Sequence, residues 1–468
     1  MDEANWSAVS RTGSASATAR GENFPGRGIS KGGATLALGV LLVVSPLVAS
    51  VSACGGADDA EDPVPRPLSE ERLVAESDGY IHGRFHRFEG SAVPSALEME
   101  QMQRLQAIGY VAGSEPAATN EVVTVYDPEA TWAGLNLLTS GHAPAAYLID
   151  MNGNILHRWE RAFDEIFPAA QLDSNQANVT FWRRARVYPD GDLVVVFTGG
   201  GIVRLDRDSR VLWARLNQAH HDIHIGRDGR ITTLTRSRRL VPRIHPEVPI
   251  LEDFVVVLDA AGEELQRVSV LKAFERSTFL ELVLSAAGEG GDFLHTNTVT
   301  VLEQPRYPVD WLRPGHVLVS VRNPSVLGVI DMERGTVVKA WKGVFRRQHE
   351  PEYVEPGRIL LFDNLGPGSN SRALEIDVHS LEPVWEYHGP PEQPLRSWTS
   401  GTTKRLPNGN TLITSSDEGR CVEVAADGRI VWEFYSPFRV GEDPVYIATL
   451  FEVERLPLDF GAEWIRAR

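Results

Sequence analysis

A repeated pair of strand patterns constrains the fold of this chain more than any other feature of its sequence. In one half of the repeat, a glycine precedes a hydrophobic strand, as in "PDGDLVVVF" from residue 189 and "EPGRILLFDN" from residue 355. In the other half, a strand that ends in Asp or a polar turn leads to a strand that ends in an aromatic residue, as in "GVIDMERGTVVKAW" from residue 328. Asp-Gly and Asn-Gly pairs between β-branched residues indicate hairpins. The sequence therefore predicts a series of antiparallel hairpins.

The spacing of these repeats predicts a six-bladed β-propeller over residues 121–468. The anchor glycines are Gly191, Gly229, Gly315, Gly357 and Gly409. Most intervals are roughly 40 to 50 residues, which is typical of four-stranded propeller blades. The longer interval between Gly229 and Gly315 predicts an insertion. Six copies of the second half-repeat indicate six blades.

The first hairpin, near residue 147, lacks a glycine-anchored partner. We expect the late strand Val445–Leu456 to complete that blade and close the ring, which would remove exposed sheet edges. Five tryptophans stand at equivalent places in the repeats, and we expect them to pack between blades: Trp159, Trp213, Trp341, Trp385 and Trp432.

The N-terminal residues 1–53 resemble a signal peptide of the lipoprotein type. Basic residues precede the apolar run Ala34–Ala53, and its end, Val51-Ser52-Ala53-Cys54, looks like a bacterial lipobox. This pattern predicts lipidation at Cys54 and an extracytoplasmic protein anchored to a bacterial membrane, in the periplasm or at the cell surface. An uncleaved transmembrane anchor is the alternative, and it places the folded part on the same side.

Between the signal and the propeller, the sequence predicts two connecting segments. Residues 54–94 are acidic and proline-rich with little hydrophobic periodicity, so we expect a flexible, disordered tether. In residues 95–120, Ser95–Gly113 has apolar residues at helical spacing, which predicts a short helix followed by a lead-in.

Charge and cysteine content exclude several classes of function. The formal net charge is −17, so the chain lacks the basic surface that nucleic-acid binding requires. The two cysteines are Cys54 and Cys421, and removal of Cys54 by lipidation would leave no intrachain disulfide. The sequence contains no GxxxxGK[ST], HExxH or GxSxG motif.

Three histidine-bearing segments occupy related places in successive repeats. The first, "NQAHHDIHIGRDGRI", contains His220, His221 and His224; the second, "FLHTNTVTVL", contains His295 and Asn297 and is followed by Arg322; the third contains His349. Each histidine lies a few residues before or at the start of an expected strand. Because such strands radiate from a central channel, we expect these side chains to meet at one channel mouth. A single histidine of this kind is usually a buried or turn residue.

Imidazoles beside a guanidinium would form a cationic pocket suited to sulfate or phosphate oxygens. One neutral histidine could act as a nucleophile, and another could protonate a departing phenoxide. The same three histidines without the arginine would instead suit a metal ion.

Together, several segments resemble the bacterial arylsulfotransferase family, whose members are PAPS-independent aryl-sulfate sulfotransferases. They are "VTVYDPEATWAGLNLLTSGHAPAAYLIDMNGNILHRW", "AHHDIHIGRDGRI", "HTNTV…VLVSVRNPSVLGVID", "QHEPEYVEPGRILLFDN" and "LPNGNTLITSSDEGR…VEVAADGRIVWEF". The resemblance covers roughly residues 121–456, in order. It implies an extracytoplasmic six-bladed propeller that moves a sulfuryl group between a phenolic ester and a phenolic acceptor, by a ping-pong reaction without cofactor or metal.

The resemblance also implies roles for individual residues. His349 would be the nucleophile that becomes sulfated, while His295 and Arg322 would hold the sulfuryl oxygens. His221 would donate and accept the phenolic proton, with His220 as the other candidate. Matching the motifs, His220, Asn297 and Asn364 would help to bind substrate.

Two departures from the family pattern and two alternative functions stay open at this point. The chain cannot form the intramolecular disulfide of the enzymes that define the activity. Glu350 and Glu352 follow His349, and carboxylates in the pocket would raise the pKa of the histidine and repel sulfate. The alternatives are a non-catalytic surface propeller that binds a partner or polyanion, and a metal-dependent lyase or hydrolase with three histidines as ligands.

Overall fold

The computed structural model describes residues 76–77, 84–87, 121–170, 172, 178–286, 291–303, 311–354, 357–440 and 446–465. All of them belong to the compact unit Glu61–Arg468. The signal peptide, the lipidation site Cys54 and the predicted helix Ser95–Gly113 lie outside the described residues. Within the described ranges, no helix has both the length and the apolar character needed to cross a membrane.

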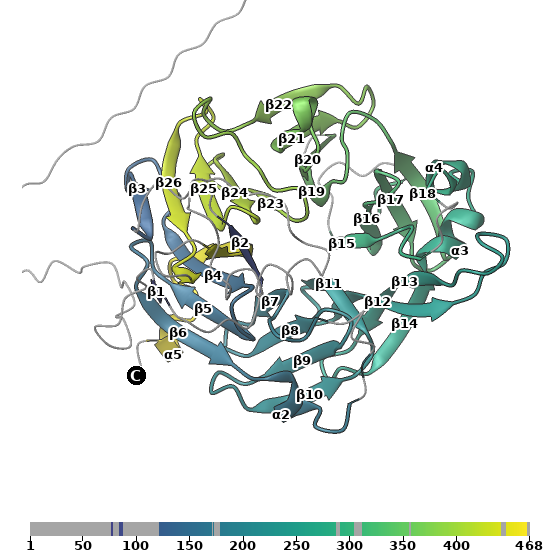
Figure 1. Cartoon of the computed structure of the whole chain (residues 1–468), viewed down its shortest axis with the longest axis horizontal. Helices are drawn as coiled ribbons and strands as arrows, with labels where there is room; N and C mark the ends of the chain where they lie inside the picture. Colours follow the sequence, from purple (N-terminus) through teal and green to yellow (C-terminus); the bar gives the residue numbers. More distant parts are fainter. Residues whose placement is uncertain are drawn as a thin grey trace, which may run out of the picture. The chain divides into compact units, whose positions relative to one another are not determined.

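Six sheets are arranged in a ring, which confirms the predicted six-bladed β-propeller (Figure 1). From the centre of the ring outward, the first blade contains β29 (Leu450–Pro457), β4 (Gly134–Ser140), β5 (Ala145–Ile149) and β6 (Ile155–Glu160). The second contains β7 (Arg184–Val187), β8 (Leu193–Phe197), β9 (Gly201–Leu205) and β10 (Val211–Arg215). The third contains β11 (Ala219–Ile225), β12 (Ile231–Arg239), β13 (Ile250–Leu258) and β14 (Glu264–Ser269).

The remaining blades repeat this plan. The fourth contains β15 (Thr296–Leu302), β16 (His316–Val321), β17 (Val326–Asp331) and β18 (Thr336–Trp341). The fifth contains β19 (His349–Val354), β20 (Arg358–Asp363), β21 (Arg372–Asp377) and β22 (Pro383–Tyr387). The sixth contains β23 (Thr402–Arg405), β24 (Thr411–Ser415), β25 (Arg420–Val424) and β26 (Ile430–Tyr435), with β3 (Val123–Tyr126) as an outer fifth strand.

The ring closes through β29, which contains only the second part of the predicted strand Val445–Leu456, because Tyr446–Ala448 form a separate strand in another sheet. This C-terminal strand pairs antiparallel with β4 from Leu450↔Ser140 to Pro457↔Gly134. On the outside, β3 pairs with β26 of the last blade, with Glu433 opposite Val125. Chain segments from both ends of the propeller therefore join across the first and sixth blades, and this closure covers strand edges that would otherwise be exposed.

The central strands of the blades are buried on both faces because a neighbouring blade covers each face. Every residue of β5 and of β8 is buried, for example. Trp159, Trp341 and Trp432 lie in outer strands and are also buried, and their indole nitrogens donate to carbonyls of the next blade: Gly191 at 3.1 Å, Val378 at 2.9 Å and Met151 at 2.9 Å. These tryptophans are packing residues, as predicted, whereas Trp213 and Trp385 are only half-buried.

The long interval between Gly229 and Gly315 contains an extended hairpin and two helices. Strands β12 and β13 are nine residues each, and α3 (Val270–Glu275) and α4 (Leu280–Leu284) follow β14. The hydroxyl of Ser269 caps α3 by accepting from the amide of Lys272. Among the described residues, the other short helices are α2 (Phe163–Ile166), η2 (Pro367–Ser369) and α5 (Ala462–Ile465).

A seventh sheet includes residues of the segment that the sequence predicts as a tether. Its order is β1 (Glu76–Ser77), β27 (Phe438–Val440), β28 (Tyr446–Ala448) and β2 (Phe85–Arg87). Arg84, just before β2, donates its amide to Gly141 at 2.5 Å and accepts from the amide of Thr449 at 3.0 Å. Residues 76–77 and 84–87 of the predicted tether therefore have backbone partners that are distant in sequence.

Candidate active site

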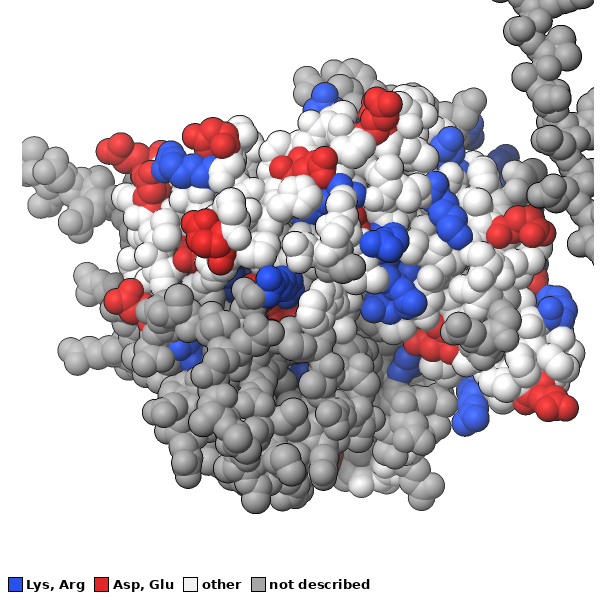
Figure 2. All heavy atoms as spheres, turned by 45° about the horizontal axis from the view of Figure 1, so that its top comes forward, with Lys and Arg blue, Asp and Glu red and all other residues white. Residues whose placement is uncertain are grey.

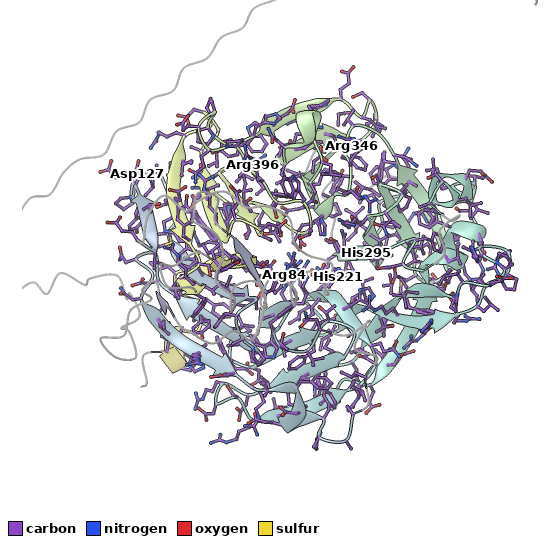
Figure 3. All side chains as sticks on the ribbon, viewed as in Figure 1. Arg84, Asp127, His221, His295, Arg346 and Arg396 are labelled. Carbon is purple, nitrogen blue, oxygen red and sulfur yellow. The ribbon has the colours of Figure 1, made fainter. Side chains whose placement is uncertain are left out.

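The three predicted histidine segments begin three adjacent innermost strands, β11, β15 and β19. Each strand breaks register with its neighbour beside its histidine: between His220 and Ile223, between Thr296 and Thr298, and between His349 and Glu352. His221, His295 and Glu350 have positive φ angles of 59°, 50° and 49°. Such bulges re-aim side chains and are frequent beside functional sites. Figure 3 shows His221 and His295 side by side near the centre of the ring.

The orientation of His349 follows from the hydrogen bonds of Asn364. The amide nitrogen of Asn364 donates to the carbonyls of Ser397 at 2.5 Å and Ser400 at 2.8 Å, so its Oδ1 must face the histidine. This Oδ1 lies 2.7 Å from Nδ1 of His349. Because the amide oxygen can only accept, Nδ1 carries the proton in the neutral ring and Nε2 keeps its lone pair.

Nε2 of His349 is buried and has no hydrogen-bond partner among the described residues. Burial lowers the pKa of His349 well below its ordinary value, and the nearby Arg322 guanidinium lowers it further. The ring is therefore neutral at neutral pH. A neutral imidazole with a free, oriented nitrogen is suited to act as a nucleophile.

His221 forms part of a chain of polar groups. Its Nδ1 lies 2.8 Å from Nδ1 of His220, whose Nε2 lies 3.4 Å from Oδ1 of Asp253. The rings of His221 and His295 meet edge to face, with centroids 4.9 Å apart. Burial lowers the pKa of His221 well below its ordinary value, and the charges of His295 and His220 add to this effect.

His295 is oriented by Asp292, whose Oδ2 lies 2.6 Å from its Nδ1. Burial would raise the pKa of Asp292, but the charge and hydrogen bond of His295 outweigh it and lower that pKa below its ordinary value. The main chain couples this histidine to the arginine, because the amide of Arg322 donates to the carbonyl of His295 at 3.2 Å. The Arg322 side chain donates to Asn323 Oδ1 at 3.0 Å and to the Trp398 carbonyl at 3.4 Å.

The structure thus brings together the four residues with predicted catalytic roles. The charges of Arg322 and His295 act on His349, and the ring of His221 contacts that of His295. The two asparagines predicted to bind substrate form hydrogen bonds within the protein. Asn297 donates to the carbonyl of Gln348 at 2.8 Å and accepts from Thr298 Oγ1 at 3.2 Å, which fixes the start of β19. Asn364 orients His349 as described above.

Sequence reasoning missed a further arginine, Arg183, at the start of the second blade. Its Nη2 donates to Ser400 Oγ at 3.2 Å, and its charge lowers the pKa of both His221 and His349. Arg183 precedes β7 just as His295 precedes β15, so a comparison of the same place in every blade would have found it. Arg84 also lies near the centre in Figure 3 and donates to Asp417 at 3.2 Å, but no pattern in the sequence indicated it.

The two glutamates that follow His349 point away from the histidines. Glu350 Oε2 lies 2.6 Å from Nη2 of the buried Arg184, which also contacts Asp222 at 3.1 Å and Glu452 at 2.8 Å. Glu352 pairs with Lys404 at 2.6 Å. We call Arg184, Asp222, Glu350 and Glu452 the ion-pair layer. The sequence raised the concern that Glu350 and Glu352 would lie beside His349 and repel sulfate. In the structure, both carboxylates have cationic partners outside the histidine cluster, Arg184 and Lys404.

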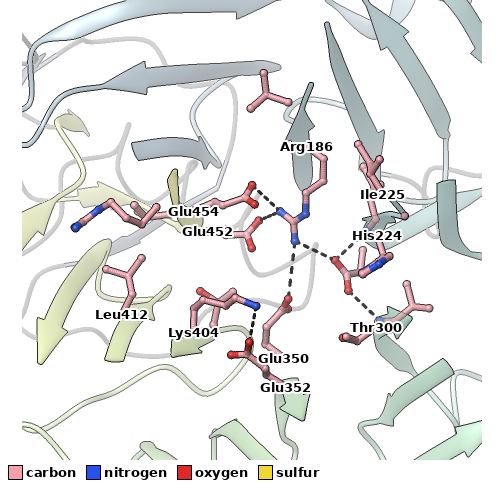
Figure 4. A pocket seen from close by; sticks show the side chains of 18 of the residues that line it. Arg186, His224, Ile225, Thr300, Glu350, Glu352, Lys404, Leu412, Glu452 and Glu454 are labelled. Atoms are coloured by element: carbon pink, nitrogen blue, oxygen red, sulfur yellow. Dashed lines mark hydrogen bonds and ion pairs between the residues drawn. The ribbon is translucent and has the colours of Figure 1, made fainter. Parts of the chain in front are cut away.

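Beyond the ion-pair layer, all six innermost strands line a cavity of about 660 Å³ (Figure 4). Arg186 of β7 lines it and contacts Glu452 and Glu454 of β29 in the adjacent blade, and His224 also lines its wall. Burial raises the pKa of Glu350 to about 7, although the charge of Arg184 opposes this effect. The side chains of Asp222, Glu350 and Glu452 from the ion-pair layer line this cavity, whereas His221, His295 and His349 are not among its lining residues.

Metal geometry among the described residues and the charges on one face of the molecule bear on the two alternative functions. No group of three or more His, Cys, Asp or Glu side chains in it has the geometry to hold a metal ion. Among the described residues, basic and acidic side chains are intermingled over the face shown in Figure 2. Both observations concern the two alternative functions, and neither favours one of them.

Comparison with known proteins gives one family. The model of a family described as arylsulfotransferase (ASST) matches residues 184–437. This range begins at Arg184 and includes the histidine segments of β11, β15 and β19. No curated protein sequence matches the chain significantly.

Several solved structures are similar over much of the chain, at low identity. A protein of unknown function from Bacteroides caccae is 13% identical, over 65% of this chain and 94% of that chain, with a TM-score of 0.43. A streptogramin B lyase is 12% identical, over 71% and 93%, with a TM-score of 0.39. A virginiamycin B lyase from Staphylococcus aureus is 12% identical, over 58% and 83%, with a TM-score of 0.33. We draw no conclusion about function from likenesses at this level.

Proposed function

Because the chain belongs to the arylsulfotransferase family, we propose that it transfers a sulfuryl group from a phenolic sulfate ester to a phenolic acceptor through a sulfated His349. Membership of the family supports arylsulfotransferase-type activity and phenolic substrates in general. The observation that carries the finer proposal is the state of His349. Its Nε2 is buried, holds a lone pair and has no partner among the described residues, within a cluster of histidines and arginines.

In the first half of the reaction, Nε2 of His349 attacks the sulfur of the donor ester. The bond from sulfur to the aryl oxygen breaks, and its electron pair leaves with the phenoxide, which takes a proton from His221. The sulfuryl group is then bonded to Nε2, and the Nδ1–H of the ring keeps its bond to Asn364. His295 and Arg322 bind the sulfuryl oxygens, since charged donors form strong hydrogen bonds to such oxygens.

In the second half, a phenolic acceptor replaces the departed phenol. Its oxygen attacks the sulfur while its proton passes to His221, and the bond from sulfur to Nε2 of His349 breaks, which returns the electron pair to Nε2. Both halves use the same residues in opposite directions, and the reaction needs no cofactor. The donor is an ester that the site itself cleaves, which agrees with the lack of a GxxxxGK[ST] phosphate-binding loop in the sequence.

Purified protein supplied with p-nitrophenyl sulfate and phenol tests this proposal. Nitrophenol release should depend on phenol and should be abolished in His349→Ala. Without acceptor, intact-protein mass spectrometry should show one added sulfuryl group, which is absent in the variant. His224→Ala is the matched control, because this histidine lies on the same strand as His221 but lines the cavity. If His349→Ala still turns over the donor, the nucleophile is wrong. If no aryl sulfate is ever turned over, a binding function is favoured.

We also propose that the mature protein begins at a lipidated Cys54 and acts outside the cytoplasm, attached to a bacterial membrane. The support is the lipobox-like sequence Val51-Ser52-Ala53-Cys54 after an apolar run. Cell fractionation should find the protein with membranes, and Cys54→Ala should change its mass and release it or block its processing. Recovery of the unmodified full-length chain in the cytoplasm would contradict this proposal.

A further inference from the structure

A buried carboxylate, Asp253, and a second histidine, His220, form a chain of close contacts that ends at His221. Asp253, on β13, receives the amide of Thr296 on its Oδ2 at 2.7 Å, which leaves Oδ1 to face Nε2 of His220 at 3.4 Å. On its other side, Nδ1 of His220 lies 2.8 Å from Nδ1 of His221. All three side chains are buried, with Asp253 and His220 each 1% exposed.

The contact between the two histidines requires one proton, and only one, between their Nδ1 atoms. Two lone pairs or two N–H groups facing each other at 2.8 Å would repel. The proton can belong to either ring. If it belongs to His221, the Nε2 of His221 carries a lone pair; if it belongs to His220, a neutral His221 carries its own proton on Nε2.

The reaction needs both of these forms in turn. His221 must give a proton to the departing phenoxide and later take one from the acceptor phenol. An ordinary acid would do this as an imidazolium, but burial and neighbouring positive charges lower the pKa of His221 well below its ordinary value. A route that keeps His221 neutral throughout removes this difficulty.

We propose that Asp253 and His220 form a proton relay that switches His221 between its acid and base forms. This inference rests on the proposed sulfotransfer and assigns to His220 a role behind His221 rather than in contact with substrate. Asp253 and His220 are positioning residues in this scheme, because they act only through His221.

The proton balance of the relay closes over one cycle. In the proposed cycle, His220 starts with a proton on each nitrogen, with the Asp253 carboxylate facing its Nε2, and His221 starts with one proton on Nε2. When Nε2–H of His221 passes to the phenoxide, the proton of His220 moves from its Nδ1 to Nδ1 of His221. Both rings are then neutral. The acceptor phenol later gives its proton to Nε2 of His221, and the Nδ1 proton returns to His220.

Asp253 is the carboxylate that faces Nε2 of His220, with its Oδ1 at 3.4 Å. Replacement of Asp253 by asparagine keeps an oxygen for the Thr296 amide, but it turns an N–H donor toward His220 and removes the negative charge. His220→Gln keeps Asp253 and its bond to Thr296 intact while removing the group that carries the proton. The two variants interrupt the same relay by different routes.

A series of aryl sulfates with leaving groups of different acidity tests the relay. An acid matters most for a poor leaving group, so both variants should lose on the order of 10² or more in kcat for phenyl sulfate, within the usual range for general acid catalysis. The loss for p-nitrophenyl sulfate, whose phenoxide is stable, should be much smaller. The dependence of rate on leaving-group acidity should therefore be steeper in Asp253→Asn and His220→Gln than in the wild type.

The control is His224→Gln, which should leave this dependence unchanged. An equal loss across all esters in both variants would overturn the relay while leaving the sulfotransfer intact, because it would indicate a structural role only. Failure of the wild type to turn over any aryl sulfate would overturn the proposed function and the relay with it. If Asp253→Asn does not fold, His220→Gln decides the question alone.

Discussion

Replacement of Glu350 by glutamine should change the pH dependence of stability without removing activity. Glu350 directly follows His349, but its side chain belongs to the ion-pair layer and contacts Arg184 at 2.6 Å. Burial raises the pKa of this carboxyl from 4.5 to about 7, against the opposing charge of Arg184. Glutamine has nearly the same shape, can still accept from Arg184 through its amide oxygen, and cannot ionise.

The sign and size of the effect follow from proton linkage. A carboxyl whose pKa is higher in the folded than in the unfolded state binds more protons when folded, so the free energy of unfolding falls as pH rises from about 4.5 to about 7. At 1.36 kcal/mol per pKa unit, a rise of this size corresponds to about 3 kcal/mol, lost in full above pH 7. Glu350→Gln removes this loss. Relative to the wild type, the variant should therefore gain stability between pH 5 and pH 8, by up to about 3 kcal/mol.

Urea unfolding of both proteins at pH 5 and pH 8, followed by tryptophan fluorescence, measures the difference. Glu352→Gln is the control, since Glu352 pairs with the exposed Lys404 and such pairs contribute about 1 kcal/mol or less. Sulfotransfer by Glu350→Gln should stay close to that of the wild type. If the stability difference between Glu350→Gln and the wild type is the same at both pH values, the argument from the buried carboxyl is refuted. If sulfotransfer is lost in a stable variant, Glu350 faces the substrate after all.

Three further outcomes follow from the site and the core. Arg322→Lys should lower kcat/KM for p-nitrophenyl sulfate by about 10²-fold, because lysine cannot offer paired planar donors to the sulfuryl oxygens; an unchanged value would remove Arg322 from the site. Because burial lowers the pKa of His349, the nucleophile should stay neutral and sulfotransfer should persist at pH 5. A loss of activity below the ordinary histidine pKa of about 6.5 would contradict the burial of His349. Burial raises the pKa of the Cys421 thiol to about 12, so thiol reagents should label it at pH 8 only after unfolding, and rapid labelling of the native protein would show that this blade opens.

Much of the fold was predictable because each blade contains its own local signals. Turn glycines, hairpin pairs and outer-strand tryptophans act over a few residues, and they gave the number of blades and the closing strand. The pairing of β2 with β28 was not predictable, because three-residue strands have no periodicity and their partners are distant in the sequence. For the same reason, nothing in the sequence placed Arg84 beside Asp417.

The site was predictable in its residues but not in its orientation. The histidines could be found because each begins an innermost strand, and this position repeats from blade to blade. The proton on Nδ1 of His349 depends on carbonyls of Ser397 and Ser400, which the pattern near the histidine cannot reveal. Arg183 and Arg184 are adjacent in the sequence, yet one acts on the histidines and the other lies in the ion-pair layer. Successive side chains along a strand point to opposite faces, so the side chains of Arg183 and Arg184 diverge. The sequence alone does not say which of the two arginines faces the histidines.

Arg184 explains how anionic residues can follow the histidines without harming an anionic substrate. Asp222 follows His221 and Glu350 follows His349, and both carboxylates contact the guanidinium of Arg184. Loss of this buried charge in Arg184→Gln would leave the carboxylates unpaired, which typically costs about 3 to 5 kcal/mol. A carboxylate released toward the cluster would also raise the pKa of His349 and repel the sulfate. The variant should therefore be less stable and, where it folds, should show a higher KM for aryl sulfate at pH 8. A stable variant with wild-type KM would mean that the carboxylates are held away by the backbone alone.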